Sequence, residues 1–413
     1  MPIANNKRSL VAAVLLATTS TCAYAEQEIV DNLADMVKKG DANFNFRYRF
    51  EYVDQDGFDE EANASTLRSR LTFASAAYKG LSFLAEVDNV ADIGDDDFNS
   101  TDNGKTEYPV VADPDGTDIN QAWLKYSWDK LAGTAGRQRI LHGDQRFVGG
   151  VAWRQNEQTY DGVRGTWASD FGLSADVSYV YTVNRIFGPD DSNAQPAQWD
   201  GDNFLLRLDY KVLENHTLAG YAYILDIDER ERWSPNKSVN NSTDTYGVHY
   251  SGKFGPVSAR ASYATQEDGG DSFQDYDAAY YMLEAGATFF GVNGKVGYEV
   301  LEGDNGVGFK TPLATLHKFQ GWADKFLITP GDGIEDIYVG FSGKLGPVKL
   351  GAIWHDFQAE DSSADFGTEI DLVATWPVNK LLSLQLKYAD FDSDDDNRYQ
   401  DTKKAWMTVN LKL

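Results

Sequence analysis

Apolar and polar residues alternate strictly along the stretch that begins at Asn43. Every even-numbered residue from Phe44 to Tyr52 is aromatic, whereas the odd-numbered residues between them are asparagine, arginine or glutamate. Successive side chains of a β-strand point to opposite faces, so this spacing predicts a strand with one apolar and one polar side. A helix over the same residues would scatter the aromatic side chains around its circumference.

The same two-residue period recurs to the end of the chain. Leu206 and Leu208 alternate with Arg207 and Asp209 in this way. Counting every such run predicts eighteen strands, at residues 43–53, 66–77, 82–91, 119–128, 133–141, 158–167, 173–185, 203–212, 217–226, 243–253, 257–266, 276–288, 292–302, 334–343, 348–357, 367–376, 381–391 and 402–413.

Two kinds of connection alternate between these strands. Tight turns lie at residues 78–81 and 254–257, for example, whereas residues 54–65, 188–202 and 392–401 form long loops rich in aspartate and glycine. Short turns at one end and long loops at the other are typical of bacterial outer-membrane barrels, and an even strand count leaves both termini at the short-turn end. We therefore expect an all-β fold, a transmembrane antiparallel up-and-down β-barrel of about eighteen strands.

The chain begins with the features of a secretory signal. Lys7 and Arg8 precede an apolar stretch, which ends at the small-residue cleavage pattern Ala23-Tyr24-Ala25. We expect residues 1–25 to be a signal peptide, residues 26–42 an N-terminal periplasmic arm, and residues 43–413 the outer-membrane barrel. Cys22 is the single cysteine. Cleavage after Ala25 removes it, and the mature chain then has neither a disulfide nor thiol chemistry.

The chain is strongly acidic. Its formal net charge is −27, and removal of Lys7 and Arg8 leaves 35 basic against 64 acidic residues, which gives −29. Nucleic acid is therefore not an expected partner. After residue 25 no apolar run is long enough for a transmembrane helix, which argues against an inner-membrane protein. The 22 tyrosines, 22 phenylalanines and 10 tryptophans suit strands that are apolar on one face.

Three long stretches resemble the alginate-export family of outer-membrane porins. They are residues 108–123, residues 136–158 and residues 311–326, which include Gly136-Arg137-Gln138-Arg139 and Thr311-Pro312-Leu313. The resemblance implies a monomeric eighteen-stranded barrel with a polar lumen that passes anionic polysaccharide or related small anions. The family name covers many porins, and the natural solute of a member need not be alginate. The terminal Leu413 departs from the aromatic residue that commonly ends such barrels.

Arginines are frequent on the predicted polar faces and in one loop. An eighteen-stranded barrel leaves an aqueous channel, and arginine forks bind carboxylates bidentately. The arginines would then select anionic solutes. The alternative is that they pair with Glu51, Glu86, Asp88, Asp161, Asp176 and Asp209 and only fill a polar lumen. The candidate pore-lining and substrate-binding residues are Arg47, Arg49, Arg68, Arg70, Arg137, Arg139, Arg146, Arg154, Arg164, Arg207 and Arg260.

Two long loops differ in composition from the acidic ones. Residues 144–158 and 303–333 mix apolar, aromatic and basic side chains, among them Trp153 and His317. We expect both loops to fold inward and narrow the channel, since long loops in compact folds are usually functional. The alternative is that they are external loops that pack on their neighbours.

Metal binding and catalysis have little support. The acidic loops lack the ligand spacing of a calcium-binding loop, so solubility is the plain explanation, with cation bridges to lipopolysaccharide as the functional alternative. The five histidines show no metal-ligand spacing, and no G-x-S-x-G elbow is present. A Ser–His pair assembled across strands, for example at His249 or His355, remains the route to an enzyme. We expect no metal and no cofactor.

These patterns together predict a porin of the cell outer membrane. We expect passive diffusion of polar, anionic solutes, such as acidic oligosaccharides or small organic acids, selected by lumen arginines and inward loops. The expected partners are outer-membrane lipid, lipopolysaccharide and the solutes themselves, and the barrel is expected to be a monomer. The alternatives are an outer-membrane barrel enzyme of the lipid hydrolase type and a secreted all-β carbohydrate-binding protein.

Overall fold

A closed β-barrel accounts for nearly all of the computed structural model, which describes residues 28–191, 195–228 and 240–413. Within these residues one sheet has twenty strands, of which β1 (Ile29–Val30) and β4 (Ala77–Tyr78) are two-residue pieces. The eighteen barrel strands are β2 (Asp41–Gln55), β3 (Ala62–Ala74), β5 (Leu81–Asp97), β6 (Gly116–Trp128), β7 (Leu131–Gln138), β8 (Thr159–Ala168), β9 (Leu173–Asn184), β10 (Gln198–Leu213), β11 (His216–Leu225), β12 (Thr243–Phe254), β13 (Val257–Asp268), β14 (Asp277–Phe289), β15 (Val292–Leu301), β18 (Ile334–Leu345), β19 (Val348–Gln358), β20 (Asp365–Pro377), β21 (Leu382–Ser393) and β22 (Thr402–Lys412).

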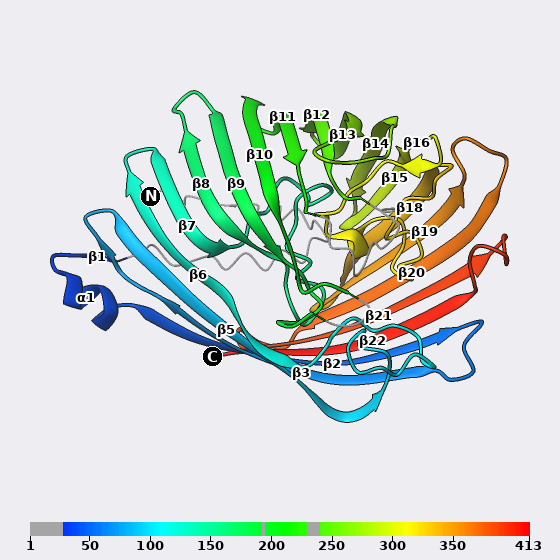
Figure 1. Cartoon of the computed structure of the whole chain (residues 1–413), viewed down its shortest axis with the longest axis horizontal. Coiled ribbons are helices and arrows are strands. Elements are labelled where there is room, and N and C mark those ends of the chain that lie inside the picture. The colour runs from blue at the N-terminus through cyan, green and yellow to red at the C-terminus, as the bar shows by residue number, and fades with distance from the viewer. Residues whose placement is uncertain (1–27, 192–194, 229–239) are drawn as a thin grey trace, which may run out of the picture.

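Each barrel strand pairs antiparallel with the next one along the chain, and the last strand returns to the first (Figure 1). The β2–β22 register runs from Asn45 opposite Lys412 to Gln55 opposite Thr402. Beyond it, the backbone N–H of Leu413 donates to the Phe44 oxygen at 2.8 Å. The sheet therefore has no free edge, and the expected eighteen-stranded antiparallel barrel is confirmed.

The two faces of the wall have the expected characters. On β2 the side chain of Phe44 is 46% exposed on the outside, whereas Arg49, on the opposite face, is 1% exposed. The outer face carries aromatic and aliphatic residues, whereas the inner face carries charged and polar residues together with buried aromatic ones such as Tyr221, Tyr280 and Trp406. None of the helices in the described part of the chain is long and apolar enough to cross a bilayer.

The wall between β3 and β5 differs from the predicted strand at residues 66–77. Strand β3 begins at Ala62 and ends at Ala74. The Ser75 N–H still donates to the Phe83 oxygen on β5 at 2.9 Å, but the return bond goes to a side chain and the next residue bonds elsewhere. The Ser75 hydroxyl accepts the backbone N–H of Phe83 at 2.9 Å, and the Ala76 N–H donates to the Met36 oxygen at 2.9 Å. The ladder therefore breaks where the N-terminal segment docks.

The N-terminal segment lies on the outer side of the wall. Helix α1 (Leu33–Lys38) is capped by Asn32, whose side chain accepts the Asp35 N–H at 3.0 Å. Its buried Met36 belongs to a small apolar cluster that packs against Phe83, on the outer face of β5. In Figure 1 this helix stands beyond the ends of the neighbouring strands. The predicted signal peptide lies outside the described residues.

The connections at the two ends of the barrel differ in length, as predicted. Tight turns such as Phe171-Gly172 and Gly255-Pro256 lie at the end that also holds α1 and the C-terminus. The longer connections lie at the other end. Two of these long connections turn into the barrel, and we name them the first inward loop (residues 139–158) and the second inward loop (residues 302–333). The second contains the short strands β16 (Gly303–Asp304) and β17 (Val307–Gly308) and the 3₁₀ turn η1 (Leu316–Lys318).

The alternation of faces leads to a prediction for β10. Leu206 faces outward near the middle of the strand, where a charged side chain would enter the hydrocarbon region. Replacing Leu206 by Lys should lower the free energy of unfolding by about 2–4 kcal/mol, whereas Ile at this position should be tolerated. Urea-induced unfolding in lipid vesicles measures both variants. Gln385→Lys on the inner face, opposite the neutral Thr375 and Thr408, is the control, and an equal loss there would contradict the assignment of faces.

Candidate functional site

The first inward loop is bonded to the inner face of the wall at β2 and β3. The Arg47 Nε donates to Gln155 Oε1 at 2.8 Å, and its two other nitrogens donate to backbone oxygens of the loop. Gln155 in turn donates to the Thr66 hydroxyl at 2.8 Å. Because Arg47, Gln155 and Thr66 are all buried, these bonds hold the loop inside the barrel rather than above it.

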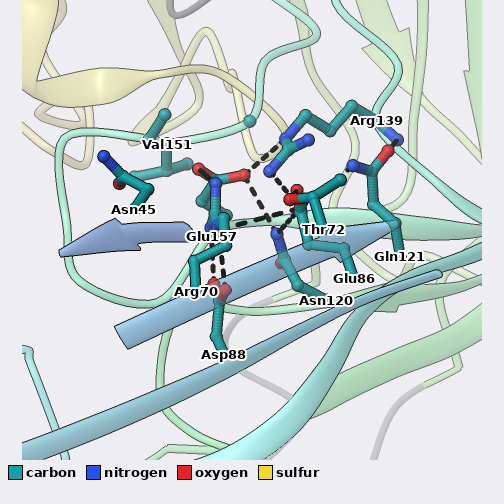
Figure 2. A network of polar contacts seen from close by, with 12 residues as sticks. Asn45, Arg70, Thr72, Glu86, Asp88, Asn120, Gln121, Arg139, Val151 and Glu157 are labelled. Atoms are coloured by element: carbon teal, nitrogen blue, oxygen red, sulfur yellow. Dashed lines mark hydrogen bonds and ion pairs between the residues drawn. The ribbon is translucent and has the colours of Figure 1, made fainter. Parts of the chain in front are cut away.

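Glu157 lies at the centre of a buried network in the same loop (Figure 2). Its carboxylate accepts from Arg70 Nη1 at 2.7 Å and from Arg139 Nε at 2.5 Å, and Arg68 Nη1 lies 3.5 Å away. Burial disfavours the ionised carboxyl, but the three guanidinium groups outweigh it and hold the pKa of Glu157 well below its usual range. Arg70 also donates from Nε to Asp88 at 2.6 Å. Arg68 and Arg70, which are both buried, therefore have carboxylates of the protein as their partners.

A second set of contacts fixes the tip of this loop near β2. Arg154 Nη1 lies 3.0 Å from Glu51 Oε2, and Arg49 Nη1 lies 3.7 Å from Asp113 Oδ2. The Arg49 guanidinium also stacks 4.2 Å from the ring centre of Trp153. All the charged groups in this set are buried, and a buried charge is tolerated when it is paired.

The loop also reaches the opposite wall. Phe147 packs 5.1 Å from the Tyr221 ring on β11 and 5.2 Å from the Tyr280 ring on β14. Arg146 Nε donates to Glu299 Oε1 on β15 at 2.8 Å. Contacts with β2 at one side and with β11 to β15 at the other mean that the first inward loop crosses the lumen.

The second inward loop lies against the first. The Gly149 N–H donates to the Leu313 oxygen at 2.8 Å, and the Thr315 N–H donates to the Gln145 oxygen at 3.0 Å. A Cβ at Gly149 would lie 2.3 Å from the Thr315 hydroxyl, so only glycine permits this approach. The two loops therefore form one unit inside the barrel.

A lysine from the wall closes this unit. Lys387 Nζ, on β21, lies 3.6 Å from the ring centre of Trp322 and 3.9 Å from that of Trp153. It is also 2.7 Å from His317 Nε2, and His317 Nδ1 is 2.7 Å from Asp324 Oδ1. A lysine ammonium has only donors, so a neutral imidazole with its proton on Nδ1 satisfies both contacts.

The electrostatics around His317 favour this neutral form. Burial lowers the pKa of the imidazole well below its usual range, and the Lys387 charge lowers it further, against the opposing effect of Asp324. Asp324 itself is buried, yet Lys404 at 2.9 Å, His317 and Arg154 at 3.4 Å keep its pKa well below the usual range. Protonation of His317 would place two cations in contact.

The eleven arginines predicted from the sequence fall into two groups. Six are buried and hold the inward loops or lie within them: Arg47, Arg49, Arg68, Arg70, Arg146 and Arg154. The other five expose 12–24% of the side chain: Arg137, Arg139, Arg164, Arg207 and Arg260. Their inner-face carboxylate partners include Asp161, Glu86, Asp176 and Asp209, which the sequence suggested as the alternative. Arg260 pairs instead with Asp144 of the first inward loop, whose pKa is about 2 because Arg260 and Lys318 outweigh its burial.

A cavity of about 360 Å³ lies between the first inward loop and β8 to β10. Its lining includes His142 of the loop together with Thr166, Asp176, Arg207 and Asp209 of the wall. Water-accessible charge on the inner face therefore lies beside the loop that crosses the lumen. Among the described residues no group of three or more histidines, cysteines or carboxylates is placed to hold a metal ion.

Sequence reasoning missed several members of this site. Lys387 and Lys404 lie on polar faces of predicted strands, so the alternation was a usable signal for their orientation. Asp113 and Asp324 gave no such signal, because each lies in a loop and meets its arginine partner only through the fold.

The His317 environment predicts a specific acid sensitivity. The unfolded chain takes up this proton near pH 6.5 and the folded chain does not, so stability falls as pH drops below about 6.5, by about 1.4 kcal/mol per pH unit until the folded pKa is reached. Replacing His317 by Gln keeps one donor and one acceptor but removes the titration. Heat-modifiable gel migration gives the temperature at which the folded band is lost. This temperature should fall less between pH 7 and pH 5 in the variant than in wild type. His216→Gln, near the tight-turn end, should behave as wild type, and equal shifts in all three proteins would contradict the argument.

Comparison with known proteins agrees with this architecture. The family model described as alginate export matches residues 40–311, more than half of the chain. Among solved structures, Acinetobacter baumannii OccAB4 has 14% identity and a TM-score of 0.67, with 90% of this chain and 98% of that chain covered. Pseudomonas aeruginosa OpdO has 12% identity and a TM-score of 0.69, with 92% and 98% covered. No curated protein matches. The chain therefore belongs to the alginate export family, as an outer-membrane β-barrel of the porin type.

Proposed function

We propose that this barrel is a channel for passive diffusion of polar, anionic solutes, such as acidic oligosaccharides or small organic acids. The observation that carries the proposal is the group of five partly exposed arginines, of which Arg207 lines the cavity beside the first inward loop. Charged groups on a pore wall are a common device for ion selection. The barrel closes on itself through β2 and β22, so a single chain suffices.

The partners of these arginines leave capacity for a solute. Arg207 uses Nε and Nη2 on Asp209, at 2.9 and 2.7 Å. A guanidinium has five N–H donors in a fixed fork, so a passing carboxylate can bind the donors that remain. The buried arginines differ from this partly exposed group, because Arg47 and Arg70 donate to the first inward loop and to a wall carboxylate. We therefore assign selectivity to the partly exposed group and only loop attachment to the buried group. Arg139 and Arg260 of the partly exposed group also bind the first inward loop, through Glu157 and Asp144.

The negative net charge of the chain opposes anion selectivity, whereas the lumen arginines favour it. The distance of each set of charges from an ion in the lumen decides which effect is larger. The acidic runs lie at the long-loop end of the barrel, at residues 59–61, 95–97 and 394–396. Exposed charges more than about 8–10 Å from a solute are largely screened in physiological salt. Arg207 and Arg260 lie on the wall itself, so their local field acts on an ion in the lumen.

An enzyme of the lipid hydrolase type has one supporting contact. His249 Nδ1 and Ser262 Oγ are 2.6 Å apart on β12 and β13. Both side chains face the lumen, however, because Val248 and Tyr263 occupy the outer face beside them, 52% and 50% exposed. A lipid substrate lies outside the wall, so this pair favours the channel over a lipase. Assay of the detergent-purified protein on phospholipid tests the alternative.

Removing two of the partly exposed arginines should change selectivity. The double variant Arg207→Ala/Arg260→Ala loses two positive charges from the lumen and leaves Asp209 and Asp144 less compensated. Reversal potentials in a salt gradient should show anion preference in the wild type and a clear shift toward cations in the variant. Lys403→Gln, at the long-loop end, should leave the reversal potential unchanged. A cation-selective wild type that is indifferent to the double change would refute the proposal.

Shortening the first inward loop should widen the channel. Deleting residues 143–150 removes Phe147 and Arg146, which hold the loop against the far wall. Single-channel conductance should rise and larger solutes should pass. Truncating the acidic loop at residues 392–396 should have neither effect. The test holds for protein that still migrates as folded before heating, and unchanged conductance would show that the loop does not limit the pore.

A further inference from the structure

Six lysines gather at the tight-turn end of the barrel. Each lies within three residues of the strand end that meets a short turn or the C-terminus. Five of them are exposed and Lys125 is half-buried. They come from six different strands spread around the wall: Lys125, Lys211, Lys253, Lys344, Lys349 and Lys412. We name this group the lysine vestibule.

The strand alternation turns these lysines toward the lumen. Lys211 lies between Tyr210 and Val212, whose outward-facing side chains are 43% and 47% exposed. Lys344 likewise precedes the outward Leu345, which is 72% exposed. Register places lysines of the vestibule opposite other inner-face residues, and Lys412 is paired with Asn45 in this way. The positive charges therefore surround the channel mouth rather than the membrane.

The charge of the vestibule is not neutralised locally. Among the described residues none of the six lysines forms an ion pair with a carboxylate. The nearby inner-face acids are already paired, since Glu284 binds Lys295 at 3.1 Å and Asp209 binds Arg207 at 2.7 Å. The adjoining turns are balanced, with Asp129, Asp170 and Glu214 against Lys79, Lys130 and Lys380.

Two of the lysines repel each other within the sheet. Lys344 on β18 and Lys349 on β19 are directly opposite in the antiparallel register. Like charges in this position destabilise a sheet. Folding alone would favour a neutral or acidic residue at one of the two positions, and a negative ligand in the lumen would relieve the repulsion between the two lysines.

The opposite end of the barrel has the opposite sign. Its loops and the adjoining end of β5 carry runs of consecutive acids at residues 59–61, 95–97 and 394–396. In an outer-membrane barrel the short turns face the periplasm and the long loops face the exterior. The molecule therefore has a basic periplasmic mouth and an acidic external rim.

We propose that the lysine vestibule is a collecting site for anionic oligosaccharides and organic anions that enter from the periplasm, and that it makes the channel rectify ionic current. This inference rests on the proposed function and adds the side from which anions enter. A mouth lined by one sign of charge concentrates the opposite ion and raises its rate of entry. Anions gather at the periplasmic mouth and cations at the external rim.

The direction of rectification follows from this arrangement. When the external side is positive, anions move outward from the mouth that concentrates them, and cations move inward from the rim that concentrates them. Both ions then accumulate in the pore and the current is high. At the opposite polarity each ion must enter through the end that repels it, so the pore is depleted of ions and the current falls.

Single-channel recording in planar bilayers tests the proposal. In 0.1 M KCl, where the Debye length is about 10 Å, the wild-type current should be about twofold or more larger with the external side positive, and the asymmetry should fade in 1 M KCl. The variant Asp395→Cys carries a cysteine at the external end of the channel. A bulky maleimide added to one side changes the current only if that side is the external one, which gives the orientation of the inserted channel. The variant Lys253→Gln/Lys344→Gln/Lys349→Gln should lose most of the asymmetry. Lys38→Gln/Lys39→Gln removes charge from the outer segment at the same end and should keep it.

A charged probe distinguishes collection from rectification alone. Oligogalacturonate added on the periplasmic side should block the current at a higher rate than from the external side, and the lysine variant should remove the difference. A neutral malto-oligosaccharide should block equally from both sides. An anion-selective channel with symmetric current and symmetric block would overturn the vestibule and leave the proposed function standing. A wild type without anion preference would instead overturn the proposed function.

Discussion

The pairing of β2 with β22 is the constraint on which the rest of the structure depends. Inside a bilayer every backbone N–H and C=O must find a partner within the protein, because no water is present to replace it. The register from Asn45 opposite Lys412 to Gln55 opposite Thr402 removes the last free edge. Once the sheet is closed, each strand has one face in lipid and one in the lumen. The two-residue alternation of apolar and polar residues in the sequence follows from this difference between the two faces.

Closure also creates an interior that has to be filled, and charge pairing decides how. Arg47, Arg70 and Arg154 would be costly to bury without partners, and so would Glu157. The wall holds most of the arginines, and the first inward loop provides Glu157 and backbone oxygens as their acceptors. The loop is therefore held by arginines that the sequence alone suggests as binding sites for the solute. The arginines proposed for solutes are the partly exposed ones, most of which pair with a carboxylate beside them on the wall.

Much of the fold was predictable because strand alternation is a local property. All eighteen predicted strands are present, and their ends differ from the predicted ones mainly where the chain leaves the wall. The strand predicted at residues 133–141 ends at Gln138, because Arg139 turns inward to Glu86 and Glu157. The division of the arginines was not predictable in this way. Arg47 donates to Gln155 across a sequence separation of 108 residues, and no local sequence pattern around either residue predicts this contact.

The backbone bonds between the two inward loops have a consequence for how the channel opens. Gly149 donates to Leu313 and Thr315 donates to Gln145, so neither loop can leave without breaking main-chain bonds to the other. Lys387 and its tryptophans add a shared anchor. Movement of one loop would leave buried polar groups unpaired in both, which makes partial displacement unfavourable. Any widening of the pore by loop movement would therefore require both loops to move together.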